Sequence, residues 1–378
     1  MKRKLYFVFD QLPGAQTGGL ITMYKRLAYL LRDLYEIEVI SAFESQQSTF
    51  EGLLVHNIHK VKTDINLAHM KQLIRQKHFV RAAFVPWSIG LYLTQAEPIK
   101  KKIKRIFDED CDPLVIAVSP AAACFMPKGV PFILEIHTFY EYFFEGSFVA
   151  KSQIKRMTSP TLTLFRTKQD ATKAPESLHP SYMYNFVLTD GNREVADVCA
   201  NRGKIIFMGR LEEEKDPMRL LRLAFMLKKV CPDFCLDIYG TGTLQKDMER
   251  EIERLNLQNQ VCLKGFTSDK TIYKEYSMVW STSKFEGFGL TIVEGKKFGL
   301  PTVSVRWKGG VDEVIHHEKD GYIADTDEEF VQYSLELITN PNKLKKMSCD
   351  AATDFARFSE DTARAQWQHL LNTFHIDK

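Results

Sequence analysis

Short apolar runs alternate with segments of helical periodicity in two successive sets along this chain of 378 residues. Runs with strand character lie at 5–9, 38–41, 53–56, 114–118, 131–136 and 187–190, and in the second half at 204–208, 234–239, 261–264, 279–281 and 302–305. Helical segments lie between them, at 21–34, 217–229, 244–255 and from 290 onward. Strands that alternate with helices predict parallel sheets covered on both faces. The two sets therefore predict an α/β protein with two doubly wound domains.

The chain is also too long for one compact core. A polar turn at 190–192 separates apolar runs and predicts the domain boundary. We expect an N-terminal domain over 1–190 and a C-terminal domain over 191–358. The last segment, 359–378, has apolar residues at helical spacing, and this predicts a terminal helix that joins the N-terminal domain. These residues are Trp367, Leu370, Leu371 and Phe374.

Overall composition excludes several classes of protein. A formal net charge of only +3 argues against a dedicated nucleic-acid binder. No apolar run approaches the length that a membrane-spanning helix needs, and the apolar run at 5–9 is too short for a signal peptide. The seven cysteines are scattered, and no nearby Cys or His completes a zinc site with Cys231 and Cys235, which is typical of reduced thiols in a cytoplasmic protein.

The segment 283–294 carries the most chemical information. A glycine-rich turn leads directly into a helix there, so the backbone N–H groups of Gly289, Leu290 and Thr291 can face a diphosphate. Glu286 lies before the helix and Glu294 about one turn inside it, so the two carboxylates can address opposite ends of one ligand. In an arbitrary sequence, the same spacing would more often be a capped helix with two solvated acids.

The surrounding motifs favour the functional interpretation, because the segment resembles the Glu-x7-Glu signature of family-4 glycosyltransferases. Further motifs follow the order of that family: Gly209-Arg210-Leu211 with Lys215, Gly240-Thr241-Gly242, Gly265-Phe266, Gly299-Leu300-Pro301, and Gly309-Gly310 with Glu313. Together they cover about 205–325. The resemblance implies the GT-B fold, in which two Rossmann-like domains face a central cleft that holds the active site.

The N-terminal half resembles the family more loosely. Gly18 and Gly19 precede a helix, as in the glycine loop that lets a donor diphosphate or an acceptor approach the backbone. His137 ends a predicted strand, where the family often carries a histidine near the donor sugar. Tyr184 stands where the family has a proline, and the lysines in 295–297 replace Ala-Met or similar residues.

The resemblance implies a retaining hexosyltransferase that moves a hexose or N-acetylhexosamine from a nucleotide sugar. UDP is the expected nucleoside diphosphate of that donor. The expected catalytic residues are Glu286, which would contact the transferred sugar, and His137. Arg210 and Lys215 are suited to the diphosphate, because its charge must be stabilised as it leaves. The expected donor-binding residues are Gly19, Arg210, Lys215, Gly240, Gly289, Leu290, Thr291 and Glu294, the last at the ribose hydroxyls. No metal or other cofactor is implied.

The basic segment 69–107 gives a clue to the acceptor substrate. Five cations share about two turns within 99–107, and 69–87 adds Lys71, Arg75, Lys77, Arg81 and Trp87. Two interpretations remain open: peripheral contact of 69–107 with anionic lipids at the inner face of the cell membrane, or a domain helix with a solvated outer face. The first agrees with a cell-surface glycan, lipid-linked or protein acceptor, and with a role in cell-wall polysaccharide biosynthesis.

Three alternatives differ in class. A non-catalytic GT-B partner subunit would have no need for intact Arg210, Lys215, Glu286 and Glu294. Hydrolysis or epimerisation of a nucleotide sugar would use the same fold and is distinguished by its products. A nicotinamide-dependent dehydrogenase would need G-x-G-x-x-G after the first strand, and the glycines at 14, 18 and 19 lack that spacing.

Overall fold

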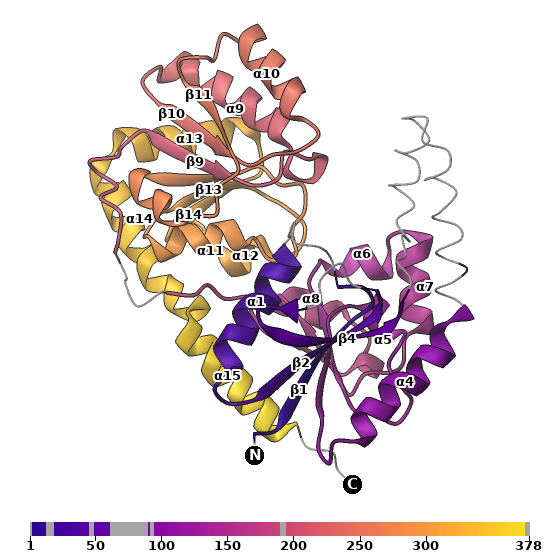
Figure 1. The fold of residues 1–378 in the computed structure, drawn as a ribbon. Coiled ribbons are helices and arrows are strands. Elements are labelled where there is room, and N and C mark those ends of the chain that lie inside the picture. The colour runs from indigo at the N-terminus through magenta and orange to yellow at the C-terminus, as the bar shows by residue number, and fades with distance from the viewer. Residues whose placement is uncertain are drawn as a thin grey trace. The chain divides into compact units, whose positions relative to one another are not determined.

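The computed structural model describes residues 2–12, 19–44, 49–60, 90, 94–189 and 194–374. The chain forms two compact units (Figure 1). The first comprises 1–166, 171–183 and 367–378, and the second comprises 167–170 and 184–366. The turn at 190–192 and the basic residues within 69–87 lie outside the described residues.

The described residues of the first unit contain an eight-stranded sheet in the order β3-β4-β2-β1-β5-β6-β7-β8. Its strand pairs are parallel except for the antiparallel pair β3–β4. Residues 5–9 of β1 are all buried, as expected for a central strand covered on both faces. The strands are β1 (Lys4–Phe9), β2 (Glu36–Phe43), β3 (Thr49–Phe50), β4 (Leu53–His59), β5 (Leu114–Ala117), β6 (Ile133–Ile136), β7 (Leu162–Phe165) and β8 (Pro180–Tyr182).

The described helices up to residue 183 are α1 (Gly19–Leu31), α4 (Ala96–Asp108), α5 (Pro120–Ala123), α6 (Tyr140–Phe144), α7 (Phe148–Arg156), α8 (Lys168–Lys173) and the 3-10 helix η1 (Glu176–Leu178). The last helix, α15 (Glu360–Thr373), ends in the first unit and runs beside α1 and β1 (Figure 1). The guanidinium of Arg3 donates to the Leu371 carbonyl at 3.4 Å, and the Tyr35 hydroxyl donates to Asn372 at 3.3 Å. Trp367 and Leu371 are buried. The end of α15 is therefore part of the first unit's core.

The sheet of the second unit has six strands in the order β11-β10-β9-β12-β13-β14, and all its described pairs are parallel. The order reverses between β9 and β12, and doubly wound sheets bind ligands at the carboxyl ends of the strands at such a point. The strands are β9 (Lys204–Met208), β10 (Cys235–Tyr239), β11 (Val261–Gly265), β12 (Met278–Ser281), β13 (Thr302–Val305) and β14 (Gly321–Ala324). The α-helices are α9 (Pro217–Val230), α10 (Gln245–Arg254), α11 (Leu290–Lys297), α12 (Val311–Val314), α13 (Asp327–Thr339) and α14 (Pro341–Asp354). The 3-10 helices are η2 (Glu213–Lys215), η3 (Thr271–Glu275) and η4 (Phe355–Phe358).

The loops that follow β9 and β10 touch through their backbones. A Cβ atom on Gly240, which has a φ of +144°, would lie 1.8 Å from the carbonyl oxygen of Gly209. A Cβ atom on Gly242 would lie 2.3 Å from the carbonyl oxygen of Leu211. The N–H of Gly209 donates to the Tyr239 carbonyl at 3.0 Å. Only glycine allows this approach at 240 and 242, so the two loops form one rigid edge of the sheet.

The predicted α/β class and most of the predicted elements are confirmed, and the run at 302–305 coincides with β13. The strand predicted at 187–190 is wrong. Val187 forms only an isolated bridge to Ser359, and its side chain is buried in the apolar cluster around Phe288 and Phe358. The first sheet continues instead with β7 and β8, which are only four and three residues long and therefore give a weak sequence signal.

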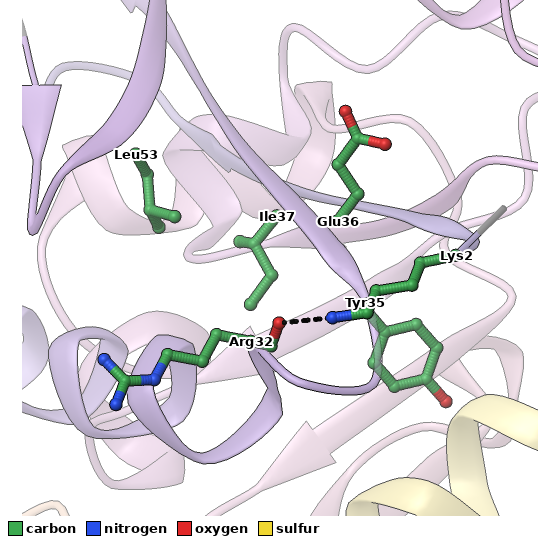
Figure 2. Close-up of a pocket in the computed structure, with 6 residues that line it drawn as sticks. All are labelled: Lys2, Arg32, Tyr35, Glu36, Ile37 and Leu53. Carbon is green, nitrogen blue, oxygen red and sulfur yellow. Dashed lines mark hydrogen bonds between the residues drawn. The ribbon is translucent and has the colours of Figure 1, made fainter.

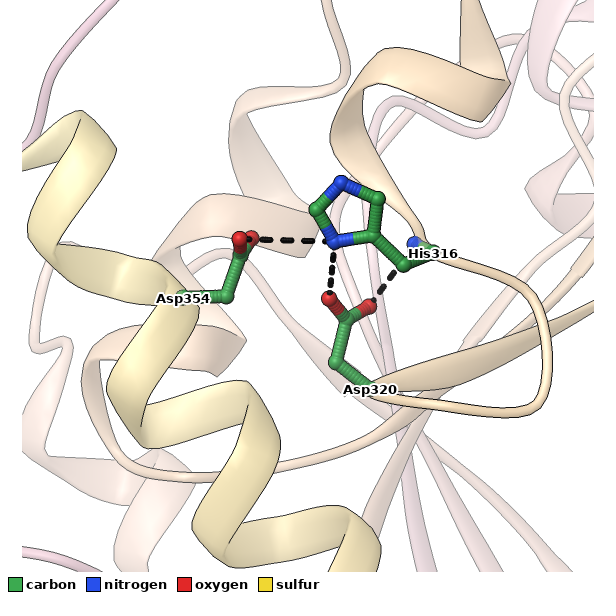
Figure 3. A group of neighbouring side chains, drawn as sticks. All are labelled: His316, Asp320 and Asp354. Atoms are coloured by element: carbon green, nitrogen blue, oxygen red, sulfur yellow. Dashed lines mark hydrogen bonds and ion pairs between the residues drawn. The ribbon is translucent and has the colours of Figure 1, made fainter.

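The two lysines near the end of α11 are buried rather than solvated. Lys296 is fully buried, and its ammonium lies 2.9 Å from Asp320 and 2.7 Å from Asp354. The His316 ring lies 2.9 Å from the Asp320 carboxylate and completes the group (Figure 3). Lys297 donates to the Leu188 carbonyl at 2.9 Å. These contacts tie α11 to α14, and they explain how the helix accommodates lysines where the family has apolar residues.

Replacing Lys296 by methionine should lower the free energy of unfolding by about 3–5 kcal/mol, because the fully buried Asp320 loses the ammonium beside it. Urea unfolding followed by tryptophan fluorescence measures the change. The matched control is Lys345→Met, since Lys345 is an exposed lysine on α14 and should shift the stability by less than about 0.5 kcal/mol. Equal midpoints for the two variants would show that the buried ion pairs contribute no net stability.

Candidate functional site

Two loops meet at the carboxyl edge of the second sheet, where the strand order reverses. Lys215, which ends η2 after β9, donates from its ammonium to Oε1 of Glu286, which lies in the turn after β12. Ser283 donates to the same oxygen at 2.6 Å. The hydroxyl of Thr282 donates to the Lys215 carbonyl at 2.8 Å. These bonds fix both the ammonium and the carboxylate, and each side chain is mostly buried.

A second lysine and glutamate pair lies along α11. Glu294 is only 5% exposed, and its Oε2 lies 3.0 Å from the ammonium of Lys270, which precedes η3. The same ammonium lies 2.9 Å from the sulfur of Met208 at the end of β9. We refer to Lys215–Glu286 and Lys270–Glu294 as the two Lys–Glu pairs. Each neutralises a carboxylate that would otherwise be buried without a countercharge, which is costly.

Lys270 belongs to no motif of the sequence and was not among the predicted site residues. It lies five positions after the end of β11, and no motif connects it with Glu294, which is 24 positions further along the chain. The available signal was a cation in the loop at a strand's carboxyl end. Such loops converge on the ligand-binding edge of a parallel sheet.

The start of α11 presents backbone donors at the same edge. Gly289 caps the helix with a φ of +82°. A Cβ atom at Gly289 would lie 3.2 Å from Ile292 and 3.3 Å from Trp307, so the close packing also disfavours a side chain there. Leu290 and Thr291 open the helix, and N–H groups of a first helical turn have no partner within the helix. The helix dipole adds partial positive charge, so this position can bind an anion.

Arg210 is the most exposed of the predicted donor-binding side chains of the second unit. It follows β9, its side chain is 68% exposed, and its guanidinium forms an ion pair with Glu214. Lys215, Glu286, Glu294 and the start of α11 also lie at the carboxyl edge of this sheet. Gly240 joins the neighbouring loops, as described above. The structure therefore brings the predicted residues of the second domain to one edge.

His137 and Gly19 lie in the first unit. Gly19 is the exposed first residue of α1, and Gly18 lies outside the described residues. His137 follows β6, at the carboxyl edge of its sheet, and 13% of its side chain is exposed. Beneath the ring is a buried carboxylate, Glu135, which lies 2.7 Å from the guanidinium of Arg166 and accepts a hydrogen bond from Tyr24.

The electrostatics of this group follow from burial and from Arg166. Burial alone would raise the pKa of Glu135, but the charges of Arg166 and His137 and the hydrogen bonds from His137 and Tyr24 outweigh it and hold the pKa at about 2. Burial and the Arg166 charge lower the pKa of His137. At neutral pH the group therefore contains an ionised Glu135 and a neutral imidazole.

A separate pocket of about 390 Å³ opens at the opposite edge of the first sheet (Figure 2). Lys2 donates across it to the Arg32 carbonyl at 3.2 Å. Glu36 and Ile37 begin β2, so the pocket lies at the amino ends of the strands. Ligands of doubly wound sheets bind at the carboxyl ends, and this pocket is therefore not part of the candidate site.

His316, Asp320 and Asp354 offer potential metal-ligand atoms within 4.8 Å of one another (Figure 3). The ammonium of Lys296 already bonds both carboxylates. The guanidinium of Arg357 donates to Asp354 at 2.7 Å. Protein cations thus balance the charge of these carboxylates, and the group is explained as an ion-pair network.

The sequence of the second unit is similar to that of known glycosyltransferases. Residues 192–354 match the family described as "Glycosyl transferases group 1". Over 183 residues the chain is 28% identical to the poly(glycerol-phosphate) alpha-glucosyltransferase of Bacillus subtilis (strain 168), covering 47% of this chain and 27% of that protein. It is also 28% identical over 185 residues to the UDP-N-acetylglucosamine--peptide N-acetylglucosaminyltransferase GtfA subunit of Streptococcus agalactiae, covering 46% and 36% of the two chains. The matched region thus spans less than half of each relative.

Solved structures resemble the chain over nearly its whole length. Anabaena Alr3699/HepE in complex with UDP-glucose is 18% identical, with a TM-score of 0.73 over 98% of this chain and 100% of that one. TarM is 13% identical, with a TM-score of 0.74 over 99% of both chains. At these identities the likeness establishes the fold. The chain therefore has the predicted GT-B fold of two Rossmann-like domains, and its residues 192–354 match the glycosyl transferases group 1 family.

Proposed function

We propose that this chain is a retaining glycosyltransferase that moves a hexose or N-acetylhexosamine from a UDP-sugar to a glycan, lipid-linked or protein acceptor. One observation carries the proposal: the two Lys–Glu pairs and the start of α11 converge at one edge of the sheet, within the region that matches the glycosyl transferases group 1 family. Each part of this arrangement matches one part of a nucleotide sugar.

The diphosphate would bind at the start of α11, where the N–H groups of Leu290 and Thr291 and the helix dipole favour an anion. Arg210 and Lys215 would add cationic donors, which matter most as charge develops on the departing diphosphate. Glu294, one turn further along α11, would accept hydrogen bonds from the ribose hydroxyls. Because protein cations and backbone donors supply the countercharge, we propose that the reaction needs no divalent metal or other cofactor.

Glu286 would bind the transferred sugar as a hydrogen-bond acceptor. Among the described residues, the contacts of its carboxylate, from Lys215 and Ser283, both fall on Oε1. Oε2 is thus available to a sugar hydroxyl, while the ammonium stabilises the ionised form. In the proposed reaction the bond from the anomeric carbon to the diphosphate breaks, and a bond to the acceptor oxygen forms on the same face. The acceptor's proton passes to the departing diphosphate.

The acceptor is proposed from the relatives and from surface charge. The named relatives act on poly(glycerol-phosphate) and on peptides, so a polyanionic or protein acceptor suits this chain. Helix α4 buries Ile99, Ile103 and Phe107 in the first unit and exposes the cationic side chains of Lys101, Lys102, Lys104 and Arg105. No helix among the described residues is long and apolar enough to cross a membrane. We propose that α4 contacts anionic headgroups at the inner face of the cell membrane through its cationic side chains.

The Glu294→Gln variant should bind UDP at least about tenfold more weakly, because the ribose loses a charged acceptor. Thermal shift of the full chain measures this, since a ligand at 100 times its dissociation constant adds about 2.7 kcal/mol of stability. The control is Glu249→Gln, at an exposed position on α10. If the wild type responds to none of UDP, GDP and ADP, the active-enzyme proposal fails, and the non-catalytic partner subunit becomes the better hypothesis.

The Glu286→Gln variant should keep UDP affinity within about threefold, because its role is at the sugar, and should lose about 10²–10³-fold in kcat. Release of UDP from a UDP-sugar, with the glycosylated product identified by mass spectrometry, measures turnover. Equal rates with and without EDTA are expected. A Glu286→Gln variant with wild-type kcat would contradict the assigned role, and free sugar as the main product would indicate a hydrolase.

Charge reversal on α4 tests the membrane proposal. The Lys101→Glu/Arg105→Glu variant should lose co-sedimentation with vesicles of phosphatidylcholine and phosphatidylglycerol, since each cation contributes about 1 kcal/mol near an anionic surface. The control reverses two exposed lysines of α14, Lys345 and Lys346. Equal losses for both variants would indicate a nonspecific charge effect, and wild-type binding to neutral vesicles would argue against recognition by charge.

A further inference from the structure

The ammonium of Lys270 has one well matched partner and one poorly matched partner. It lies 3.0 Å from Oε2 of Glu294 and 2.9 Å from the sulfur of Met208. An ammonium has three hydrogens to donate, and a thioether sulfur is only a weak acceptor. Among the described residues, Glu294 is thus the only strong acceptor within reach of this ammonium. The lysine side chain is 36% exposed, so a further acceptor can approach it from solvent.

The loop that carries Lys270 is anchored on both sides of it. On one side, Asp269 accepts hydrogen bonds from the backbone N–H and the hydroxyl of Thr271, at 2.8 and 2.7 Å. On the other, Tyr273 of η3 is fully buried, and its hydroxyl donates to the Thr291 carbonyl at 3.3 Å. This second bond ties η3 to the first turn of α11. The backbone of Lys270 is therefore fixed relative to the helix that carries Glu294.

The Lys270–Glu294 pair presents a donor and an acceptor side by side. An ammonium can only donate hydrogen bonds, and an ionised carboxylate can only accept them. A hydroxyl oxygen can lie about 2.8 Å from both Nζ and Oε2, an ordinary hydrogen-bond length, because these two atoms are themselves 3.0 Å apart. Each carboxylate oxygen has two lone pairs, so Oε2 can keep the ammonium while it accepts from the hydroxyl. The pair is thus complementary to a hydroxyl that donates and accepts at once, as those of ribose do.

We infer that Lys270 is a specificity-determining residue, whose ammonium donates to the oxygen of one ribose hydroxyl while that hydroxyl donates to Glu294. The inference rests on the proposed function for the identity of the ligand and for the ribose contact of Glu294. It gives the hydroxyl two charged partners in place of one, so a nucleotide without that hydroxyl loses two hydrogen bonds. A lysine that only neutralised Glu294 would affect the ribose through the carboxylate alone.

The experiment measures the dissociation constants of the full chain for UDP, 2′-deoxy-UDP and 3′-deoxy-UDP by isothermal titration calorimetry. One of the two deoxynucleotides lacks the shared hydroxyl, and the wild type should bind it about 100-fold more weakly than UDP, because two hydrogen bonds to charged groups are lost. In Lys270→Met this preference for UDP should fall at least about tenfold. The control is Lys274→Met, since Lys274 lies on η3 and pairs with Glu194, and it should keep the wild-type preference.

A direct contact is separated from an effect through the carboxylate by removing Glu294 first. In Glu294→Gln the lysine can still donate to the hydroxyl, so adding Lys270→Met should lower the remaining preference for UDP by a further factor of about five. A lysine that acted only through Glu294 would give no further change. The double variant contains no unpaired charge at this position, so it provides the test even if Lys270→Met alone does not fold.

The same preference for UDP in the wild type and in Lys270→Met, or no further change in the double variant, would overturn the inference. In both cases UDP still binds, so the proposed function stands and the inference fails alone. A wild type that binds none of the three nucleotides would disprove the proposed function, and the inference with it. Because the readout is binding, the result does not depend on knowing the acceptor or the transferred sugar.

Discussion

The second unit depends on one topological constraint, which is that parallel strands all end at the same edge of their sheet. The strand order reverses between β9 and β12, and the loops that follow these two strands meet at the carboxyl edge of the sheet. The backbone contact between Gly209 and Gly240 makes the neighbouring loops rigid. Lys215, Glu286 and the start of α11 can therefore occupy fixed positions, although 71 residues separate the lysine from the glutamate.

Charge neutralisation is the second constraint, and it recurs in both units. Glu135 with Arg166, Glu294 with Lys270, and Asp320 with Lys296 are each a buried carboxylate beside a cation. A buried carboxylate without a partner would take up a proton or destabilise the fold. The same pairing thus stabilises the fold around Lys296 and holds the Glu294 carboxylate in place at the candidate site. Burial and charge alone do not separate the two roles, but position at the carboxyl edge of a sheet does.

Sequence predicted the fold and part of the candidate site for different reasons. Periodicity located strands such as β13, because a buried parallel strand is a continuous apolar run. Spacing located Glu286 and Glu294, because both flank one short helix. Lys270 was missed, as was the network of Tyr24, Glu135 and Arg166, because their partners lie 24 to 111 positions away. A strand was wrongly predicted at 187–190 from apolar character alone. Val187 instead packs into the apolar cluster with Phe288 and Phe358.

The two cations proposed to bind the diphosphate, Arg210 and Lys215, differ in side-chain exposure, and this difference predicts which of them can move during the proposed reaction. The Arg210–Glu214 pair is on the surface, where such pairs contribute only about 0–1 kcal/mol, so a diphosphate can displace Glu214 at little cost. Lys215 is held by a mostly buried glutamate, and its removal would leave that carboxylate unpaired. Arg210 is therefore suited to capture the diphosphate and to adjust as charge develops. Lys215 is suited to remain in place and keep Glu286 ionised beside the sugar.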